Sequence, residues 1–263
     1  MKFSFVVLAL FVIVSCSSSN LNDEDTLKHY QKSSKDHNYQ QAYDALLKLN
    51  RSKKYQNYAT NELGSFYEHG FYVKKDLNKA LELYSKAGNQ KYIPAMYNVA
   101  RIRFDQGKFS EAKSILENIK DYAPALNLLG IIYENGNGTE IDVNIALDYF
   151  TQAAQKGNAD AQFNLGQVYY QSDLVKKDDE KARHWYELSA EQGYTSATLQ
   201  LATMYARGDG VEENYSKAIE LIKPLAEAGH ADAIYNIRFY YKNINDLSEY
   251  HQWDQKCAET VGC

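Results

Sequence analysis

The strongest constraint on this chain is a pattern of alanine, leucine, glycine and tyrosine that recurs at a fixed interval. In one stretch it reads Ala161, Leu165, Gly166 and Tyr169, and these spacings keep the four residues on one side of a helix that turns about 100° per residue. The same residue types return 36 positions later. A fixed period of this length is typical of stacked helical pairs. The sequence therefore predicts an all-α, right-handed solenoid of stacked antiparallel helix pairs.

Six alanines mark the first helix of successive pairs. They are Ala59, Ala95, Ala125, Ala161, Ala197 and Ala233, at intervals of 36, 30, 36, 36 and 36 residues. Counted from each alanine, position +5 is Gly or Ala in the first five units, and position +8 is Tyr in all units but one. The small residue lets the partner helix approach, and the large residues fill the groove between successive pairs.

The ends of the expected second helices are marked as well. Good N-cap residues stand four positions before the second-helix alanines. Their side-chain oxygen accepts a free backbone N–H at the start of a helix. They are Asp76, Asp142, Asp178 and Asn214. Gly157, Gly193 and Gly229 are again 36 residues apart and are expected to end a helix in the left-handed conformation. In the best-matched unit, Trp185 is expected to be the largest inward-facing side chain and to pack between Leu165, Tyr169 and the following first helix.

These residues resemble Sel1-like repeats, a longer relative of tetratricopeptide repeats. The family pattern is A-x-x-x-L-G-x-x-Y, a Gly-rich connector, and D-x-x-K-A-x-x-W/Y-Y-x-x-A-A-x-x-G, and Lys79, Lys181 and Lys217 occupy its lysine position. The unit that starts at Ala95 departs from it, since the longer connector is missing and Arg103 replaces tyrosine. The resemblance implies a scaffold that binds other proteins.

The amino terminus predicts export. Lys2 precedes an apolar run over 3–14, which is too short to span a membrane and fits a secretory signal. The run ends in Ser15-Cys16, which resembles the lipobox of bacterial lipoproteins and implies cleavage before Cys16 and acylation of that residue. An ordinary signal peptide with an incidental cysteine is the alternative. Ser17 after the cysteine is, in that family, usually associated with the outer membrane. Which side of that membrane the protein faces stays open, with the periplasm preferred.

Together these patterns predict five segments. They are a signal peptide at 1–15, a polar tether at 16–25, a divergent helical pair at 26–56, repeats at 57–230 with one short tetratricopeptide-like unit at about 93–122, and a divergent capping unit at 231–263. The two remaining cysteines, Cys257 and Cys263, are an even pair in an exported chain, which favours a disulfide over two free thiols.

Composition and motifs argue against several functional classes. A net charge of −5 with 44% hydrophobic residues does not suit a disordered or a nucleic-acid-binding protein. The six histidines are scattered, and no metal-ligand spacing, phosphate loop or nucleophile motif occurs. We therefore expect no catalytic residue, metal or cofactor. The alternative is a hydrolase or binder of β-lactam or peptidoglycan fragments, because some cysteine-rich Sel1-like proteins are linked to such ligands; this chain lacks their cysteine pair in each repeat.

The candidate binding surface is the side of the first helices that faces away from the packing residues, at positions +2, +3, +6 and +10. It is rich in amides, which suit the backbone of an extended peptide, and in aromatic rings. The candidate peptide-binding residues are Asn61, Asn98, Arg101, Asn127, Phe163, Asn164, Gln167, Gln200, Tyr235 and Asn236. An asparagine at +3 is common in Sel1-like repeats, so a purely structural role is the alternative. The sequence thus predicts a monomeric, lipid-anchored envelope scaffold that binds a protein or extended peptide on its concave face.

Overall fold

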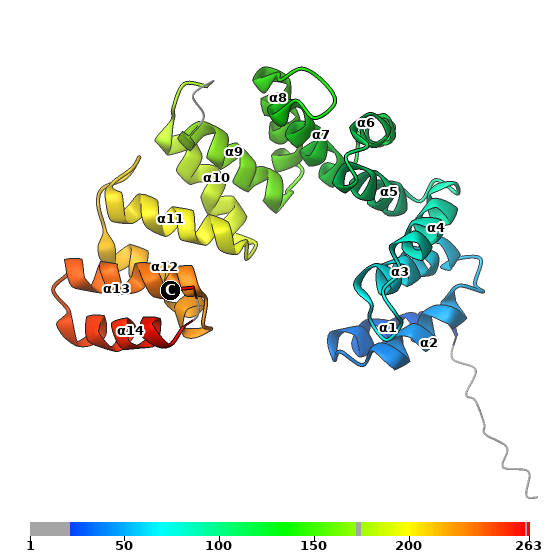
Figure 1. Ribbon diagram of the computed structural model, residues 1–263, viewed down its shortest axis with the longest axis horizontal. Helices are drawn as coiled ribbons and strands as arrows, with labels where there is room; N and C mark the ends of the chain where they lie inside the picture. Colours follow the sequence, from blue (N-terminus) through cyan, green and yellow to red (C-terminus); the bar gives the residue numbers. More distant parts are fainter. Residues whose placement is uncertain (1–21, 172–174, 261) are drawn as a thin grey trace, which may run out of the picture. The chain divides into compact units, whose positions relative to one another are not determined.

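The computed structural model describes residues 22–171, 175–260 and 262–263. In this part of the chain fourteen helices are joined by connectors and no strand occurs (Figure 1), which confirms the all-α repeat solenoid. The expected signal peptide and Cys16 lie outside the described residues. The helices are α1 Asp23–Lys35, α2 Tyr39–Leu49, α3 Gln56–His69, α4 Leu77–Gly88, α5 Ile93–Asp105, α6 Phe109–Glu117, α7 Ala123–Asn135, α8 Val143–Gln155, α9 Ala159–Gln171, α10 Asp179–Glu191, α11 Thr195–Arg207, α12 Tyr215–Glu227, α13 Ala231–Asn243 and α14 Leu247–Glu259.

Helix α1 begins earlier than the sequence suggested, so the last residues of the expected tether are helical. Asn22 caps it, because its side-chain oxygen accepts the N–H of Asp25 at 2.9 Å. Asp23, Glu24 and Asp25 all lie in the first turn, where negative charge is favourable beside the helix dipole.

The helix pairs fall into two kinds, which differ in the length of their connector. In α3–α4, α7–α8, α9–α10 and α11–α12 the connector has seven residues, and in α1–α2, α5–α6 and α13–α14 it has three. The middle residue of each short connector is left-handed: His37, Gly107 and Asn245 have φ of 56°, 74° and 59°. Glycine adopts this conformation freely, and asparagine and histidine tolerate it better than most residues.

The long connectors end in the predicted caps. The side chains of Asp76, Asp142, Asp178 and Asn214 each accept the N–H of the residue three positions later, at 2.8–3.0 Å. The backbone N–H of each cap also donates to the carbonyl of the tyrosine at position +8 of the preceding helix, at 2.7–2.9 Å. Each seven-residue connector is therefore closed at its end by the same pair of bonds.

The small residue at +5 lies where the two helices of a pair cross. A Cβ at Gly64, Gly130 or Gly166 would lie 2.7, 2.5 or 2.6 Å from the ring of Tyr84, Phe150 or Tyr186, respectively. Real Cβ atoms do not approach a neighbour this closely, so only glycine admits these buried rings at the crossing.

Where the crossing residue is larger, its partner is smaller. Ala202 shares a buried cluster with Ile222, which occupies the position of Tyr186 one period later. In the last pair the crossing positions hold Arg238 and Asp254, which form an ion pair at 2.7 Å. A larger residue at +5 is thus accompanied by a smaller partner across the crossing.

Trp185 packs against the cluster that contains Leu165 and is joined there by Tyr169, as expected. It is only partly buried, however, and the fully buried ring of α10 is Tyr186. The two neighbours point about 100° apart on the helix. Tyr186 therefore lies at the crossing opposite Gly166, and Trp185 lies between successive pairs.

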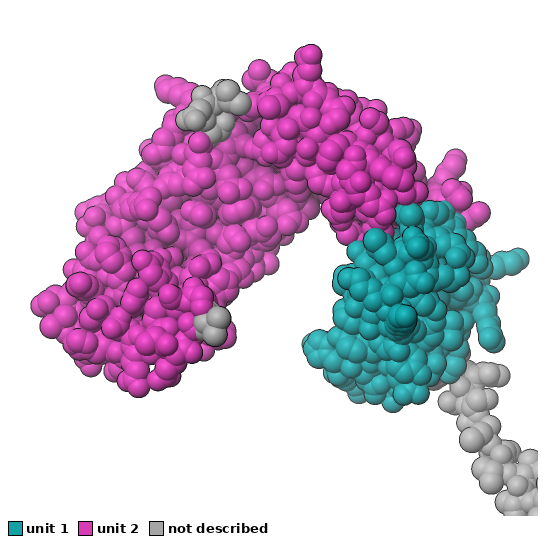
Figure 2. All heavy atoms as spheres, viewed as in Figure 1, with its two compact units in different colours: residues 1–86 teal, residues 87–263 magenta. Residues whose placement is uncertain are grey.

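The chain divides into two compact units, 1–86 and 87–263 (Figure 2), with the boundary inside α4. In unit 1 a buried cluster, which includes Tyr30, Leu46 and Phe66, joins α1, α2 and α3. In unit 2 four clusters follow one another along the stack, as expected when each pair packs mainly on its neighbours.

At the carboxyl end the structure joins Cys257 of α14 to Cys263 by a disulfide, with Cα atoms 5.3 Å apart. The bond closes a short segment, so its effect is local. No helix among the described residues combines the length and apolar character needed to cross a membrane.

Candidate functional site

All ten candidate binding residues lie on first helices. Asn61 is on α3 in unit 1, and the other nine are in unit 2: Asn98 and Arg101 on α5, Asn127 on α7, Phe163, Asn164 and Gln167 on α9, Gln200 on α11, and Tyr235 and Asn236 on α13. Within unit 2 first helices contact one another directly in the pairs α5–α7, α7–α9 and α11–α13.

The outward-facing assignment is wrong for two asparagines at position +2, since Asn61 and Asn127 are only 6% and 8% exposed. Asn127 accepts a hydrogen bond from the side-chain amide of Asn164 at 2.9 Å, which links α7 to α9. Asn61 donates to Glu62, and Glu62 accepts from the hydroxyl of Tyr30 at 2.8 Å. Position +2 therefore faces a neighbouring first helix, and these amides hold the scaffold together.

Phe163, also at +2, has a similar structural position. Its ring lies 5.6 Å from that of Tyr186 and 5.1 Å from that of Tyr194, which directly precedes α11. It is half-buried against the cluster of α10 and α11. Such ring contacts stabilise the stacking of pairs and leave only part of Phe163 for a partner.

Helix α13 differs because no later first helix covers it in the described part of the chain. Tyr235 and Phe239 are 52% and 54% exposed, the largest exposed aromatic surface on unit 2. The guanidinium of Arg238 lies 4.7 Å from the centre of the Tyr235 ring, within cation–π distance, and also pairs with Asp254. The ring of Tyr235 is thereby held in place while one face stays accessible.

A hollow of about 410 Å³ adjoins this aromatic surface. Arg207 of α11, Tyr215 of α12, and Asn236, Phe239 and Tyr240 of α13 lie around it. Burial raises the pKa of the Tyr240 hydroxyl above its ordinary value. A guanidinium, an amide and aromatic rings converge here, a combination that suits polar backbone and apolar side chains of a bound segment.

The sequence located part of this hollow. Asn236 was among the candidates, and Arg207 occupies position +10 of the same helix face. Tyr215 was missed because it belongs to the start of a second helix, and the period of the first helices carries no signal for it.

Among the described residues no group of three or more histidine, cysteine or acidic side chains could hold a metal ion. Burial raises the pKa of Glu134, but the cause is structural. In the α3–α4 pair the equivalent Glu68 accepts a hydrogen bond from Tyr84 at 2.8 Å, whereas in the α7–α8 pair the position of Tyr84 is held by Phe150, which has no hydroxyl group.

Comparison with known proteins identifies the repeats. Residues 57–92, 123–158, 159–194 and 195–230 match the model of the Sel1 repeat, more than half of the chain. The chain belongs to the Sel1-repeat family. The four matched segments are those with seven-residue connectors. Sel1-repeat proteins are generally protein-interaction scaffolds and typically non-catalytic.

Individual relatives include one protein matched by sequence and one matched by structure. A putative sel1-like repeat-containing protein of Acanthamoeba polyphaga mimivirus is 45% identical over 51 residues, which is 19% of this Sel1-repeat chain and 10% of the viral one. The crystal structure of a Sel1 repeat protein from Oxalobacter formigenes is 25% identical with a TM-score of 0.65, covering 90% of this chain and 97% of that one.

Two further crystal structures resemble the fold alone. A protective antigen of uropathogenic Escherichia coli strains is 24% identical, with a TM-score of 0.68 over 90% of this chain and 53% of that one. An immunity protein from Pseudomonas aeruginosa is 23% identical, with a TM-score of 0.55 over 87% of this chain and 82% of that one.

Proposed function

We propose that this Sel1-repeat protein is a non-catalytic, monomeric scaffold that holds another protein at the bacterial cell envelope, as an outer-membrane lipoprotein facing the periplasm. The observation that supports binding most directly is the exposed surface of α13, where Tyr235 and Phe239 adjoin the hollow that contains Arg207 and Asn236. Exposed aromatic rings beside polar groups are typical of surfaces that bind proteins.

The chemistry of this surface favours an extended segment of the partner. The side-chain amide of Asn236 can donate to a backbone carbonyl and accept from a backbone N–H. Phe239 and Tyr235 offer flat apolar contact area at a small cost in conformational entropy. Binding of this kind breaks no bond, so recognition and positioning are the whole of the activity.

Co-purification tests this surface. From a membrane extract, the wild-type protein is expected to carry a partner in a fixed ratio, and a Tyr235→Ala/Phe239→Ala variant is expected to lose about 2 kcal/mol or more of binding free energy, at least thirtyfold in Kd. Leu247→Ala is the control, since Leu247 is also 52% exposed but lies on α14. Equal recovery with all three proteins would contradict the proposal.

The anchor is proposed from Ser15-Cys16 at the end of the apolar run. A Cys16→Ser variant is expected to incorporate no labelled fatty acid and to leave the membrane fraction, because the acyl chains supply the membrane affinity. Cys263→Ser is the control and is expected to stay membrane-bound. Unchanged fractionation of Cys16→Ser would show that the protein is not anchored through this residue.

A further inference from the structure

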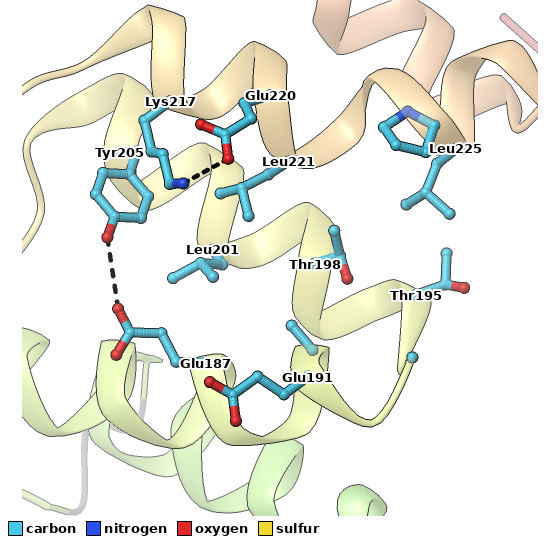
Figure 3. Close-up of a pocket in the computed structure, with 13 residues that line it drawn as sticks. Glu187, Glu191, Thr195, Thr198, Leu201, Tyr205, Lys217, Glu220, Leu221 and Leu225 are labelled. Carbon is cyan, nitrogen blue, oxygen red and sulfur yellow. Dashed lines mark hydrogen bonds and ion pairs between the residues drawn. The ribbon is translucent and has the colours of Figure 1, made fainter.

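A second cavity lies between α10 and α12, the second helices of two successive pairs. It is a groove of about 520 Å³ whose floor is α11 (Figure 3). Leu201, Leu221 and Leu225 line it with apolar surface, and Glu187 and Glu191 lie at the edge formed by α10. These residues differ from those of the hollow at α13, so the groove is a separate surface.

Each pair of successive second helices has a slot between them, and the groove is the slot between α10 and α12. It is open because one side chain is smaller here than in the slots on either side. Trp185, 36 residues before Leu221, packs against the cluster of α8 and α9. The last pair has a connector that is shorter by four residues, so its corresponding position is held by Trp253. Trp253 is 7% exposed and packs against α12 and α13. An indole thus fills the slot on either side, whereas Leu221 leaves this one open.

A second substitution widens the same slot. In the preceding repeat Gln162 is buried and bridges to the carbonyl of Ala154 at 3.2 Å and to the side chain of Gln192 at 2.7 Å. The equivalent residue in the groove is Thr198, whose hydroxyl bonds back to the carbonyl of Tyr194 on its own helix at 3.3 Å. The amide bridge across the slot is therefore replaced by a short side chain.

The charge at the rim is unbalanced. Glu187 pairs with Arg183 at 2.6 Å, and Glu220 pairs with Lys217 at 2.7 Å. Glu191 lies at the same rim, is exposed, and forms no ion pair with any residue that the structure describes. One negative charge is thus left at the edge of an apolar groove, where a cation of a bound segment would be attracted.

We propose that this groove binds a segment of a partner protein that carries a tryptophan with a lysine or arginine beside it. The indole would occupy the space that Trp185 and Trp253 occupy in the flanking slots, and the cation would lie against Glu191. Tryptophan and arginine are also the residues most often found to dominate protein interfaces.

The proposal is tested with the tripeptide Lys-Trp-Lys as the probe. In an NMR titration of the isotope-labelled full chain, the amide signals of Ala190, Thr198 and Leu221 are expected to shift and saturate. Lys-Ala-Lys is expected to cause no saturable shift. Glu-Trp-Glu is expected to bind the wild-type protein about fivefold or more weakly than Lys-Trp-Lys does, and the Glu191→Lys variant is expected to bind Lys-Trp-Lys more weakly by a similar factor. No saturable shift with Lys-Trp-Lys would overturn the proposal, and equal affinity for the two tryptophan peptides would overturn its basic component.

Two matched variants separate loss of the site from loss of the fold. Leu221→Trp is expected to abolish binding with its helical circular dichroism retained, because tryptophan occupies this position in both flanking pairs. Trp185→Leu combined with Gln162→Thr is expected to open the equivalent slot between α8 and α10 and to add a second set of shifting amides there, with lower affinity because Gln155 holds the position of Glu191. Wild-type affinity in Leu221→Trp would place the site elsewhere. If the double variant gains no second set, the indole and the amide bridge do not decide which slot is open, and the slot-filling argument is wrong.

Discussion

Replacing Tyr186 by alanine is expected to lower the free energy of unfolding by about 3–5 kcal/mol, the range typical of a large buried ring that leaves a cavity. Tyr186 is fully buried at the crossing with α9 and belongs to the cluster that joins α10 to α11. Since each pair packs mainly on its neighbours, the loss should weaken α9, α10 and α11 first. Urea unfolding, followed by circular dichroism, measures the change.

The control for this prediction is Tyr186→Phe. The buried hydroxyl of Tyr186 has no hydrogen-bond partner among the described residues, so its removal is expected to change stability by less than about 0.5 kcal/mol, or to raise it. If the phenylalanine variant lost as much stability as the alanine variant, the ring would not be the stabilising group and the packing assigned to Tyr186 would be wrong.

A leucine at Gly166 is expected to cost about 3 kcal/mol for the opposite reason. Its Cβ alone would lie 2.6 Å from the Tyr186 ring, so the two helices would have to move apart. The next repeat shows how the crossing accepts a larger residue, since Ala202 there faces Ile222.

Transplanting that pair gives a sharper test of the same crossing. Gly166→Ala and Tyr186→Ile are each expected to destabilise, by about 1–3 kcal/mol. Together they reproduce the pair found one period later, so the double variant is expected to be at least about 1 kcal/mol more stable than the sum of the single effects predicts. Simple additivity would show that the two positions do not share one crossing.

The period of the sequence was sufficient to predict the packing within a pair. Ala161, Leu165 and Gly166 are buried as expected, and Asp178 caps α10 as its residue type indicates. These features depend on contacts inside one repeat, and such contacts return with the repeat. Trp185 shows the limit, because a shift of one residue changes which ring lies at the crossing and which lies between pairs.

The surface was harder to predict because it depends on contacts between repeats. The spacing along one helix places Asn127 on the side away from its partner helix, but the next first helix packs on that side and buries it. Tyr235 has the same position in its repeat and is exposed, since no first helix follows α13 among the described residues. Whether a residue at this position binds a partner thus depends on its place in the stack.

Whether the surface of α13 holds another protein is tested most directly by photo-crosslinking in intact cells. A benzophenone amino acid in place of Phe239 is expected to give one discrete adduct with an envelope protein, and the same group in place of Leu247 is expected to give none. The adduct should disappear when Asn236→Ala and Tyr235→Ala are added. No adduct at position 239, or the same adducts at both positions, would contradict the proposed scaffold function.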